Sequence, residues 1–384
     1  MRPLFCALAC SIASVACGDA DSGNTGGGPG SGATGSSSTA PTTGSTMPSS
    51  STGSSASTGQ GGAPPVTALE HLVGRFDESD PAGPVATWSG TSYQTRISGG
   101  ELAIDLDGAS GVFFQVVIDG TPTQVIETDG NSPYVVATGL GAGEHDVLVY
   151  RRVEGFFGEV QFRGFVPGAS TTQVETVWPY AHRVEFIGDS ITCGYGVEGP
   201  DEFCDFTGDT ESAYETYAAI ASRNVNAAAH LIAFSGKGVY QNYGGNMDEL
   251  MPELYGRTLT GDAASAWDFS AFTPDAVVIN LGTNDFSAAI DGSAFTGAYI
   301  DLLGTVRGHY PDAAIFTVTW QHWGGTNQGY VLSAVEQFGD ANVHPVAFDI
   351  EPADGWGCDY HPSKATHQKL GQKLTEVFQQ TLGW

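Results

Sequence analysis

The feature that most constrains the fold is a regular alternation of two kinds of segment between residue 183 and the C-terminus. Apolar runs rich in β-forming residues alternate with longer segments whose apolar residues recur at helical spacing. The apolar runs are residues 184–187, 230–234, 276–281, 314–319 and 345–350, and the helical segments are residues 212–226, 295–309, 329–338 and 363–382. This alternation predicts a parallel sheet with helices on both faces, and Ser363 is the predicted N-cap of the last helix.

The preceding part of the chain has a different pattern. Between residues 69 and 174, short runs of β-forming residues are separated by Gly, Asp, Asn and Pro turn signals. The runs are residues 91–97, 101–106, 111–118, 134–137, 144–151 and 159–166. They predict an all-β sandwich, of the jelly-roll type, over residues 66–175, followed by an α/β domain over residues 176–384. The sandwich could bind sugar or serve only as a structural partner of the second domain.

The N-terminus has the features of an export signal. Arg2 supplies a positive charge, and residues 4–17 form an apolar stretch too short to span a bilayer. Ser14-Val15-Ala16-Cys17 resembles the lipobox of bacterial lipoproteins, although Ser14 lies where that motif prefers Leu. We expect residues 1–17 to be a lipoprotein-type signal peptide, with a plain secretory signal as the alternative. Residues 18–65, nearly all Gly, Ser, Thr, Ala and Pro, are expected to form a disordered linker.

The charge and the cysteine content limit the kinds of function that this chain can have. With 43 acidic against 14 basic residues, the chain carries a formal charge of −29, which excludes binding to a nucleic-acid backbone. Outside the leader, the cysteines are Cys193, Cys204 and Cys358. For an exported protein these predict one disulfide and one buried thiol, with the pairing left open. No His or Cys cluster has zinc-ligand spacing, so neither a metal nor another cofactor is predicted.

Chemically distinctive residues follow the predicted strands of the second domain. The motifs are Gly188-Asp189-Ser190, Ser235-Gly236-Lys237-Gly238, Gly282-Thr283-Asn284-Asp285 and, after the last strand, Cys358-Asp359-Tyr360-His361-Pro362. Because the carboxyl ends of parallel strands meet at one edge of a sheet, we expect these motifs to converge. Acyl transfer needs a nucleophile, a base and donors for the developing oxyanion. We predict Ser190 as nucleophile and His361 as base. Ser190, Gly236 and Asn284 are the predicted oxyanion donors, and Asp189 is expected to shape the turn.

The order of these motifs resembles that of the SGNH (GDSL-type) hydrolase superfamily. The preceding sandwich and the stretches GDSITCGYGVEG, FSGKGVYQNYGG and DYHPS are similar to carbohydrate esterase family two. This resemblance implies a jelly roll joined to an SGNH domain that removes acetyl groups from polysaccharides such as xylan and glucomannan. The wider superfamily places its acid three residues before the histidine, where this chain has Cys358. The narrower family makes Asp359 the candidate third member, with a backbone carbonyl or Asp354 as alternatives.

Aromatic residues near the same loops are candidates for binding sugar, because flat rings stack on the apolar faces of sugars. The predicted substrate-binding residues are Trp320, Trp323, Trp356 and Tyr243. We expect a monomer that acts on acetylated polysaccharide or oligosaccharide, is located in the bacterial cell envelope or secreted, and touches a membrane only through an N-terminal lipid anchor. Two other functions stay open: a lipid or small-ester hydrolase on the same scaffold, and a non-catalytic sugar-binding protein. The intact Ser190 and His361 argue against the latter.

Overall fold

The structure is a computed structural model that describes residues 67–321 and 326–384. The predicted signal peptide and linker, and Trp323, lie outside these residues. The described residues all fall within a single structural unit. Within that part of the chain, no helix combines the length and the apolarity that a membrane crossing requires.

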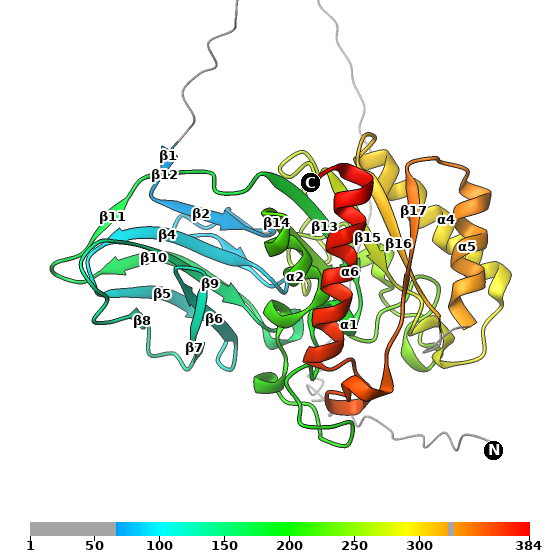
Figure 1. The fold of residues 1–384 in the computed structure, drawn as a ribbon, viewed down its shortest axis with the longest axis horizontal. Coiled ribbons are helices and arrows are strands. Elements are labelled where there is room, and N and C mark those ends of the chain that lie inside the picture. Colours follow the sequence, from blue (N-terminus) through cyan, green and yellow to red (C-terminus); the bar gives the residue numbers. More distant parts are fainter. Residues whose placement is uncertain (1–66, 322–325) are drawn as a thin grey trace, which may run out of the picture. The chain divides into compact units, whose positions relative to one another are not determined.

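The first part of this unit is a sandwich of two antiparallel sheets (Figure 1). One sheet has the order β11 (Thr172–Val174), β4 (Ser92–Ser98), β9 (Glu144–Arg151), β6 (Phe113–Ile118) and β7 (Thr121–Glu127), and β2 (Glu70–Val73) also pairs with β4. The other sheet has the order β3 (Val85–Ala86), β10 (Val160–Pro167), β5 (Leu102–Gly108) and β8 (Tyr134–Ala137). Alternate residues point inward, as Leu102, Ile104 and Leu106 of β5 do, and form the core between the sheets.

This arrangement confirms the predicted all-β fold. The predicted runs omit β7 because its residues are almost all exposed, so the sequence there carries no alternation of apolar and polar residues. A short additional pairing joins β1 (Thr67–Ala68) to β12 (Thr176–Val177), at the two ends of the sandwich sequence.

The second part is built on a parallel sheet of five strands, as predicted. Their order is β14 (Ala227–Ala233), β13 (His182–Gly188), β15 (Ala276–Asn280), β16 (Ala314–Trp320) and β17 (Val343–Phe348). Successive residues of a strand face opposite sides of the sheet. Val278 therefore packs in the core beneath α2 (Tyr217–Asn224) and α6 (Lys364–Leu382). Its neighbours Val277 and Ile279 pack in the core beneath α4 (Gly292–His309) and α5 (Thr326–Phe338).

Each face of the sheet is covered by one pair of adjacent helices: α2 lies beside α6 on one face, and α4 lies beside α5 on the other (Figure 1). Ser363 is the N-cap of α6, as predicted, and its hydroxyl accepts a hydrogen bond from the N–H of Thr366 at 3.2 Å. Leu370, Leu374 and Phe378 form the buried face of this helix. Two short helices complete the domain, α1 (Ser190–Cys193) directly after β13 and α3 (Met251–Leu254).

A buried ion pair connects the sandwich to the parallel sheet. Arg75, which follows β2, lies 3.2 Å from Glu185 on β13, and both side chains are fully buried. The hydroxyls of Tyr255 and Tyr310 also donate to the Glu185 carboxylate, at 2.9 and 3.3 Å. The charge of each partner is thus compensated within the protein, which a buried ion pair requires.

Candidate active site

Ser190 occupies the first position of α1, at the point where β13 ends. Asp189 is the N-cap of this short helix, and its Oδ1 accepts a hydrogen bond from the N–H of Ile191 at 3.0 Å. A Cβ on Gly188 would lie 2.1 Å from the Thr192 hydroxyl, so only glycine fits before the turn. Asp189 therefore shapes the turn as expected. Because Ser190 is at the first position of the helix, its N–H has no hydrogen-bond acceptor within the helix.

His361 reaches Ser190 from the loop before α6. Its Nε2 lies 2.8 Å from Ser190 Oγ, and its Nδ1 lies 3.1 Å from the carbonyl oxygen of Asp359. A carbonyl can only accept, so Nδ1 must carry the proton and donate it. Nε2 is then left as the acceptor for the Ser190 hydroxyl, which is the tautomer that a general base needs.

The predicted contact of the Asp359 carboxylate with the imidazole is contradicted by this geometry. Asp359 Oδ2 instead accepts a hydrogen bond from the Tyr195 hydroxyl at 2.9 Å. The backbone explains the difference: Asp359 and the next residue, Tyr360, both have positive φ, 52° and 59°, which turns the Asp359 carbonyl rather than its side chain toward the ring. Asp354 does not replace it, because its carboxylate is paired with Lys369 at 2.8 Å.

The environment of His361 favours its neutral form. Burial lowers the pKa of His361 to about 4, although the hydrogen bond to the Asp359 carbonyl opposes this shift. The ring of Tyr195 lies against the imidazole, with centroids 4.3 Å apart, and stacks on Phe206 at 3.8 Å on its other side. His361 is therefore available as a base at neutral and mildly acidic pH.

The loop after β14 brings Gly236 to the same edge of the sheet. Its φ of +78° is in the left-handed region that glycine adopts without strain. Among the described residues, its N–H has no hydrogen-bond acceptor. Asn284, after β15, donates through Nδ2 to the carbonyl of Lys237 at 2.9 Å and to Asp189 Oδ2 at 3.4 Å. The structure thus brings Ser190, His361, Gly236 and Asn284 to one edge, where the amide of Asn284 is next to the loop that carries Gly236.

The side chain of the neighbouring Asp285 holds the main chain of the loop that follows Gly236. Its buried carboxylate accepts hydrogen bonds from the N–H groups of Val239, Tyr240 and Gln241 at 3.1, 2.7 and 3.0 Å. Burial raises the pKa of Asp285, and these three donors act in the opposite direction. Of the Thr-Asn-Asp motif, Asn284 therefore contributes its side chain to the site, and Asp285 uses its side chain to hold the main chain of the adjacent loop.

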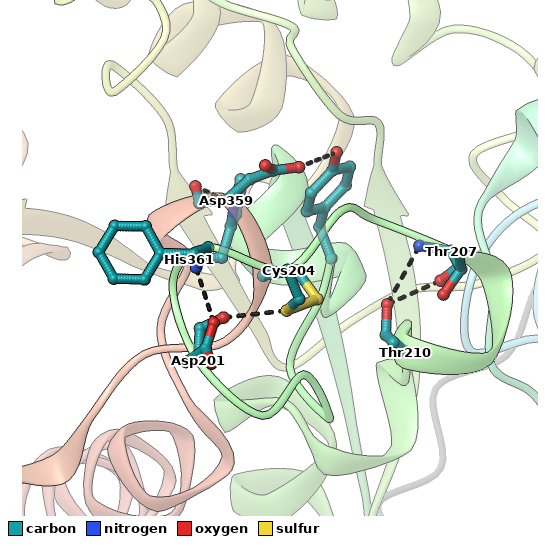
Figure 2. The surroundings of a disulfide bond; sticks show 9 residues. Asp201, Cys204, Thr207, Thr210, Asp359 and His361 are labelled. Atoms are coloured by element: carbon teal, nitrogen blue, oxygen red, sulfur yellow. Dashed lines mark hydrogen bonds between the residues drawn. A yellow bond between two sulfur atoms is a disulfide. The ribbon is translucent and has the colours of Figure 1, made fainter. Parts of the chain in front are cut away.

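A disulfide joins Cys204 to Cys358, and Cys193 is the buried free thiol. The predicted number of disulfides is thus confirmed, and the pairing that the sequence left open is resolved. Cys358 is directly before Asp359, and its N–H donates to the carbonyl of Gly196 at 3.0 Å. Figure 2 shows the disulfide beside Asp359 and His361. The bond therefore ties the catalytic loop to the segment that follows α1.

The predicted substrate-binding aromatics have different environments. Trp320 is only 1% exposed, packs against Phe348, and donates to Asn280 Oδ1 at 3.2 Å, which corrects its assignment to a sugar groove. Trp356 is half-buried and lines a cavity of about 450 Å³ next to the catalytic loop. Tyr243 is 64% exposed and lies beyond Gly236 in the segment that follows β14. Trp323 lies outside the described residues.

One group of metal-ligating side chains lies close together in the described part of the chain. The ligand atoms of Glu154, Cys193 and Glu211, all buried, are within 4.8 Å of one another. Both carboxylate oxygens of Glu154 are already hydrogen-bonded to Ser235. Sequence analysis missed this cluster, because its members come from three separate segments and no local spacing connects them.

Two family models match the chain. Residues 72–175 match the carbohydrate esterase 2 N-terminal model, and residues 186–369 match the GDSL-like lipase/acylhydrolase family. Among proteins of known function, the cellulase/esterase CelE of Acetivibrio thermocellus is 40% identical over 81% of this chain, which spans 39% of CelE. An acetylxylan esterase/glucomannan deacetylase of Cellvibrio japonicus is 26% identical over 82% of this chain and 89% of its own length.

Comparison with solved structures also finds a carbohydrate esterase, and here the match extends over nearly the full length of the relative. A family two carbohydrate esterase from Clostridium thermocellum, solved in complex with cellohexaose, has a TM-score of 0.78 and 39% identity. The match covers 82% of this chain and 99% of that one, across both the sandwich and the parallel sheet. The chain therefore belongs to carbohydrate esterase family two.

Proposed function

We propose that the protein is a serine esterase that removes O-acetyl groups from a polysaccharide of the xylan or glucomannan type. The observation that carries this proposal is the 2.8 Å contact between Ser190 Oγ and His361 Nε2, with Nδ1 of the ring held by the carbonyl of Asp359. The names of the relatives, which include esterases and acetylxylan esterases, support the substrate class.

The reaction follows from the positions of these groups. Ser190 Oγ attacks the acetyl carbonyl carbon while His361 Nε2 takes its proton. The resulting oxyanion is stabilised by the N–H groups of Ser190 and Gly236 and by the amide of Asn284, which can exchange its 3.4 Å contact to Asp189 for the oxyanion. The C–O bond to the sugar then breaks, and the sugar oxygen takes the proton from His361. Water hydrolyses the acetyl-enzyme by the same sequence and releases acetate.

We further propose that the chain is exported as a monomer and anchored to the cell envelope by a lipid on Cys17. The support is the leader and the Gly- and Ser-rich segment that follows it. Lipidation would place the full-length protein in the membrane fraction, and Cys17→Ala would release it to the soluble fraction. Equal fractionation of both forms would contradict the anchor, and gel filtration of the soluble form would test the monomer.

The decisive experiment compares acyl chain length and substrate class on the same enzyme. We expect hydrolysis of 4-nitrophenyl acetate and release of acetate from acetylated xylan or glucomannan, with much slower hydrolysis of the octanoate ester. Ser190→Ala should abolish both acetyl activities while the protein stays folded. A preference for octanoate would favour the lipid-hydrolase alternative. Binding of polysaccharide without any turnover would favour the non-catalytic one.

A further inference from the structure

The β-sandwich contributes one buried carboxylate to the loop that carries Gly236. Glu154 lies shortly after β9, at the N-cap of the 3₁₀ turn η1 (Gly155–Phe157), and is fully buried. Its Oε2 accepts a hydrogen bond from the main-chain N–H of Ser235 at 2.6 Å. Its Oε1 is hydrogen-bonded to the Ser235 hydroxyl. Ser235 directly precedes Gly236, so this carboxylate contacts the residue next to the proposed oxyanion donor.

We propose that Glu154 is a positioning residue of the esterase reaction, which holds Ser235 so that the N–H of Gly236 points at the oxyanion formed at Ser190. The inference rests on the proposed function, since it assigns a role within that reaction. It implies that the sandwich takes part in catalysis by orienting one of the three oxyanion donors, without touching the substrate.

The direction of the Gly236 N–H is set by the rotation of the peptide plane between Ser235 and Gly236. Downstream, the next peptide plane, between Gly236 and Lys237, is held by the N–H of Tyr243, which donates to the Gly236 carbonyl at 2.8 Å. Upstream, the two hydrogen bonds to Glu154 are the anchors found among the described residues at Ser235. A left-handed glycine can reorient at little cost, so the loop needs a fixed residue on each side. Oxyanion donors are effective only when they are held in place before the reaction.

The Glu154 carboxylate is surrounded by other polar side chains. The Cys193 thiol lies within 4.8 Å of the Glu154 carboxylate, and Glu211 Oε1 accepts a hydrogen bond from the N–H of Glu154 at 3.2 Å. Arg151 donates to the Glu154 carbonyl at 3.1 Å, and Glu154 opposes ionisation of Asp189. Burial raises the pKa of both Glu154 and Glu211, and each carboxyl also opposes ionisation of the other. The hydrogen bonds from Ser235 act in the opposite direction on the pKa of Glu154, so they favour its ionised form.

Three substitutions at Glu154 separate positioning from mere stability. Glu154→Asp keeps the charge but withdraws it by one methylene, and Glu154→Ala removes it. Glu154→Gln is the rescue variant, because its carbonyl can accept from the Ser235 N–H while its amide donates to the hydroxyl. We expect kcat on 4-nitrophenyl acetate to fall about 10²-fold in the Ala variant and at least about tenfold in the Asp variant, with KM changed less than about threefold. The Gln variant should recover to within about tenfold of the wild type.

The second measurement requires no turnover. Phenylboronic acid forms a covalent tetrahedral adduct with a serine hydroxyl, and the negatively charged adduct places an oxygen where the oxyanion would lie. Its dissociation constant, measured by calorimetry, should rise in step with the loss of kcat for the Ala and Asp variants. Arg96→Ala is the control, since Arg96 pairs with Asp146 at the surface of the sandwich, among the described residues away from the loop that carries Gly236. It should leave both kcat and boronate affinity unchanged.

The outcomes are distinct. Loss of kcat together with boronate affinity, at nearly constant KM and with rescue by Gln, supports the positioning role. Folded Asp and Ala variants with wild-type kcat and boronate affinity but a lower melting temperature would reduce Glu154 to a structural residue and overturn the inference. If the Ala variant does not fold, the Asp variant decides alone. A wild-type protein that binds boronate but hydrolyses no acetyl ester would instead refute the proposed function.

Discussion

At the scale of single residues, the main feature of this site is that a main-chain carbonyl takes the place of an acid beside His361, the proposed base. The Asp359 carbonyl fixes the tautomer of His361 as an aspartate would, but it is a neutral dipole. It therefore stabilises the imidazolium formed during attack less than a full negative charge does. The Asp359 side chain is used elsewhere, in a hydrogen bond with Tyr195.

This geometry predicts a mild phenotype for loss of the Asp359 charge. Asp359→Asn should keep kcat within about threefold of the wild type, because asparagine also tolerates a positive φ and can accept from the Tyr195 hydroxyl. The measurement is steady-state kinetics on 4-nitrophenyl acetate, with His361→Ala as the reference for loss of the base. In a site where a carboxylate orients the histidine, the corresponding change costs on the order of 10⁴ in kcat. A loss of that size here would mean that the carboxylate contacts the ring during the reaction.

The pH dependence should reflect the lowered pKa of His361. The base works only in its neutral form, so kcat/KM should fall as the pH drops through about 4, the pKa that burial sets, rather than near the 6.5 of a free imidazole. A pH profile of kcat/KM on an acetyl ester measures this limb. Burial also raises the pKa of Asp189 to about 7, so Asp189→Asn serves as the control that removes this second ionisation. Burial also raises the pKa of Glu154 to about 7, so the assignment would be contradicted by an acidic limb between pH 6 and 7 that persists in the Asp189→Asn/Glu154→Gln double variant.

At the scale of elements, the chain before α6 depends on long-range ties because it has little regular structure of its own. It consists of short turns, η6 (Pro352–Asp354) and η7 (Cys358–Tyr360), with consecutive residues of positive φ directly before His361. Such conformations cost free energy and persist only when the surroundings hold them. The disulfide to Cys204 and the hydrogen bond from the Cys358 N–H to Gly196 supply that support.

Removal of the disulfide should therefore affect both stability and turnover. The bond joins residues 154 positions apart, and its loss is expected to lower the free energy of unfolding by about 2–5 kcal/mol. We also expect kcat to fall, because the Asp359 carbonyl would no longer be fixed on His361. The test is a titration of the wild type with dithiothreitol, with activity and melting temperature followed together. The Cys204→Ser/Cys358→Ser double variant is the control, and it should be impaired from the start and insensitive to reductant. Wild-type kcat in the folded double variant would show that the loop holds its shape without the bond.

At the scale of the whole molecule, the sandwich and the parallel sheet share buried polar interactions as well as a boundary. Arg75 brings a charge from the sandwich to Glu185 on β13 of the parallel sheet, and its guanidinium also donates to the carbonyls of Tyr255 and Arg257 at 2.5 and 2.9 Å. Glu154 makes the corresponding contact at the oxyanion loop. Each part therefore provides hydrogen-bond or ionic partners for buried polar groups of the other. Separation of the two parts would leave these groups unpaired.

This coupling predicts a single cooperative unfolding transition for the two parts. Arg75→Met should lower the free energy of unfolding by about 3–5 kcal/mol, because it leaves Glu185 buried without its cation. The Arg75→Met/Glu185→Gln double variant should recover a large part of that loss. Urea unfolding followed by tryptophan fluorescence and by far-UV circular dichroism measures both. Two separated transitions in the wild type, or equal stability of Arg75→Met and the wild type, would contradict the coupling.

Much of the fold was predictable from the sequence, because its signals are local. The change from short β runs to alternating strands and helices follows from side-chain periodicity, which each element carries in its own residues. The convergence of Ser190, Gly236, Asn284 and His361 was also predictable, since parallel strands place their carboxyl ends at one edge whatever the packing details. The strand β7 was missed because it lies exposed and lacks such a periodicity.

The tertiary structure alone decided the features that depend on direction or on distant partners. Trp320 and Trp356 look alike in sequence, yet one is in the core and the other lines a cavity, because Trp320 ends a strand that is buried on both faces whereas Trp356 is in the loop before α6. The turn at residues 359–360 exchanges a carboxylate for a carbonyl through backbone rotation, which residue type does not determine. The Cys204–Cys358 pairing and the contact of Glu154 with Ser235 join segments 154 and 81 positions apart. No local pattern encodes such contacts, because they form only when the complete chain has packed.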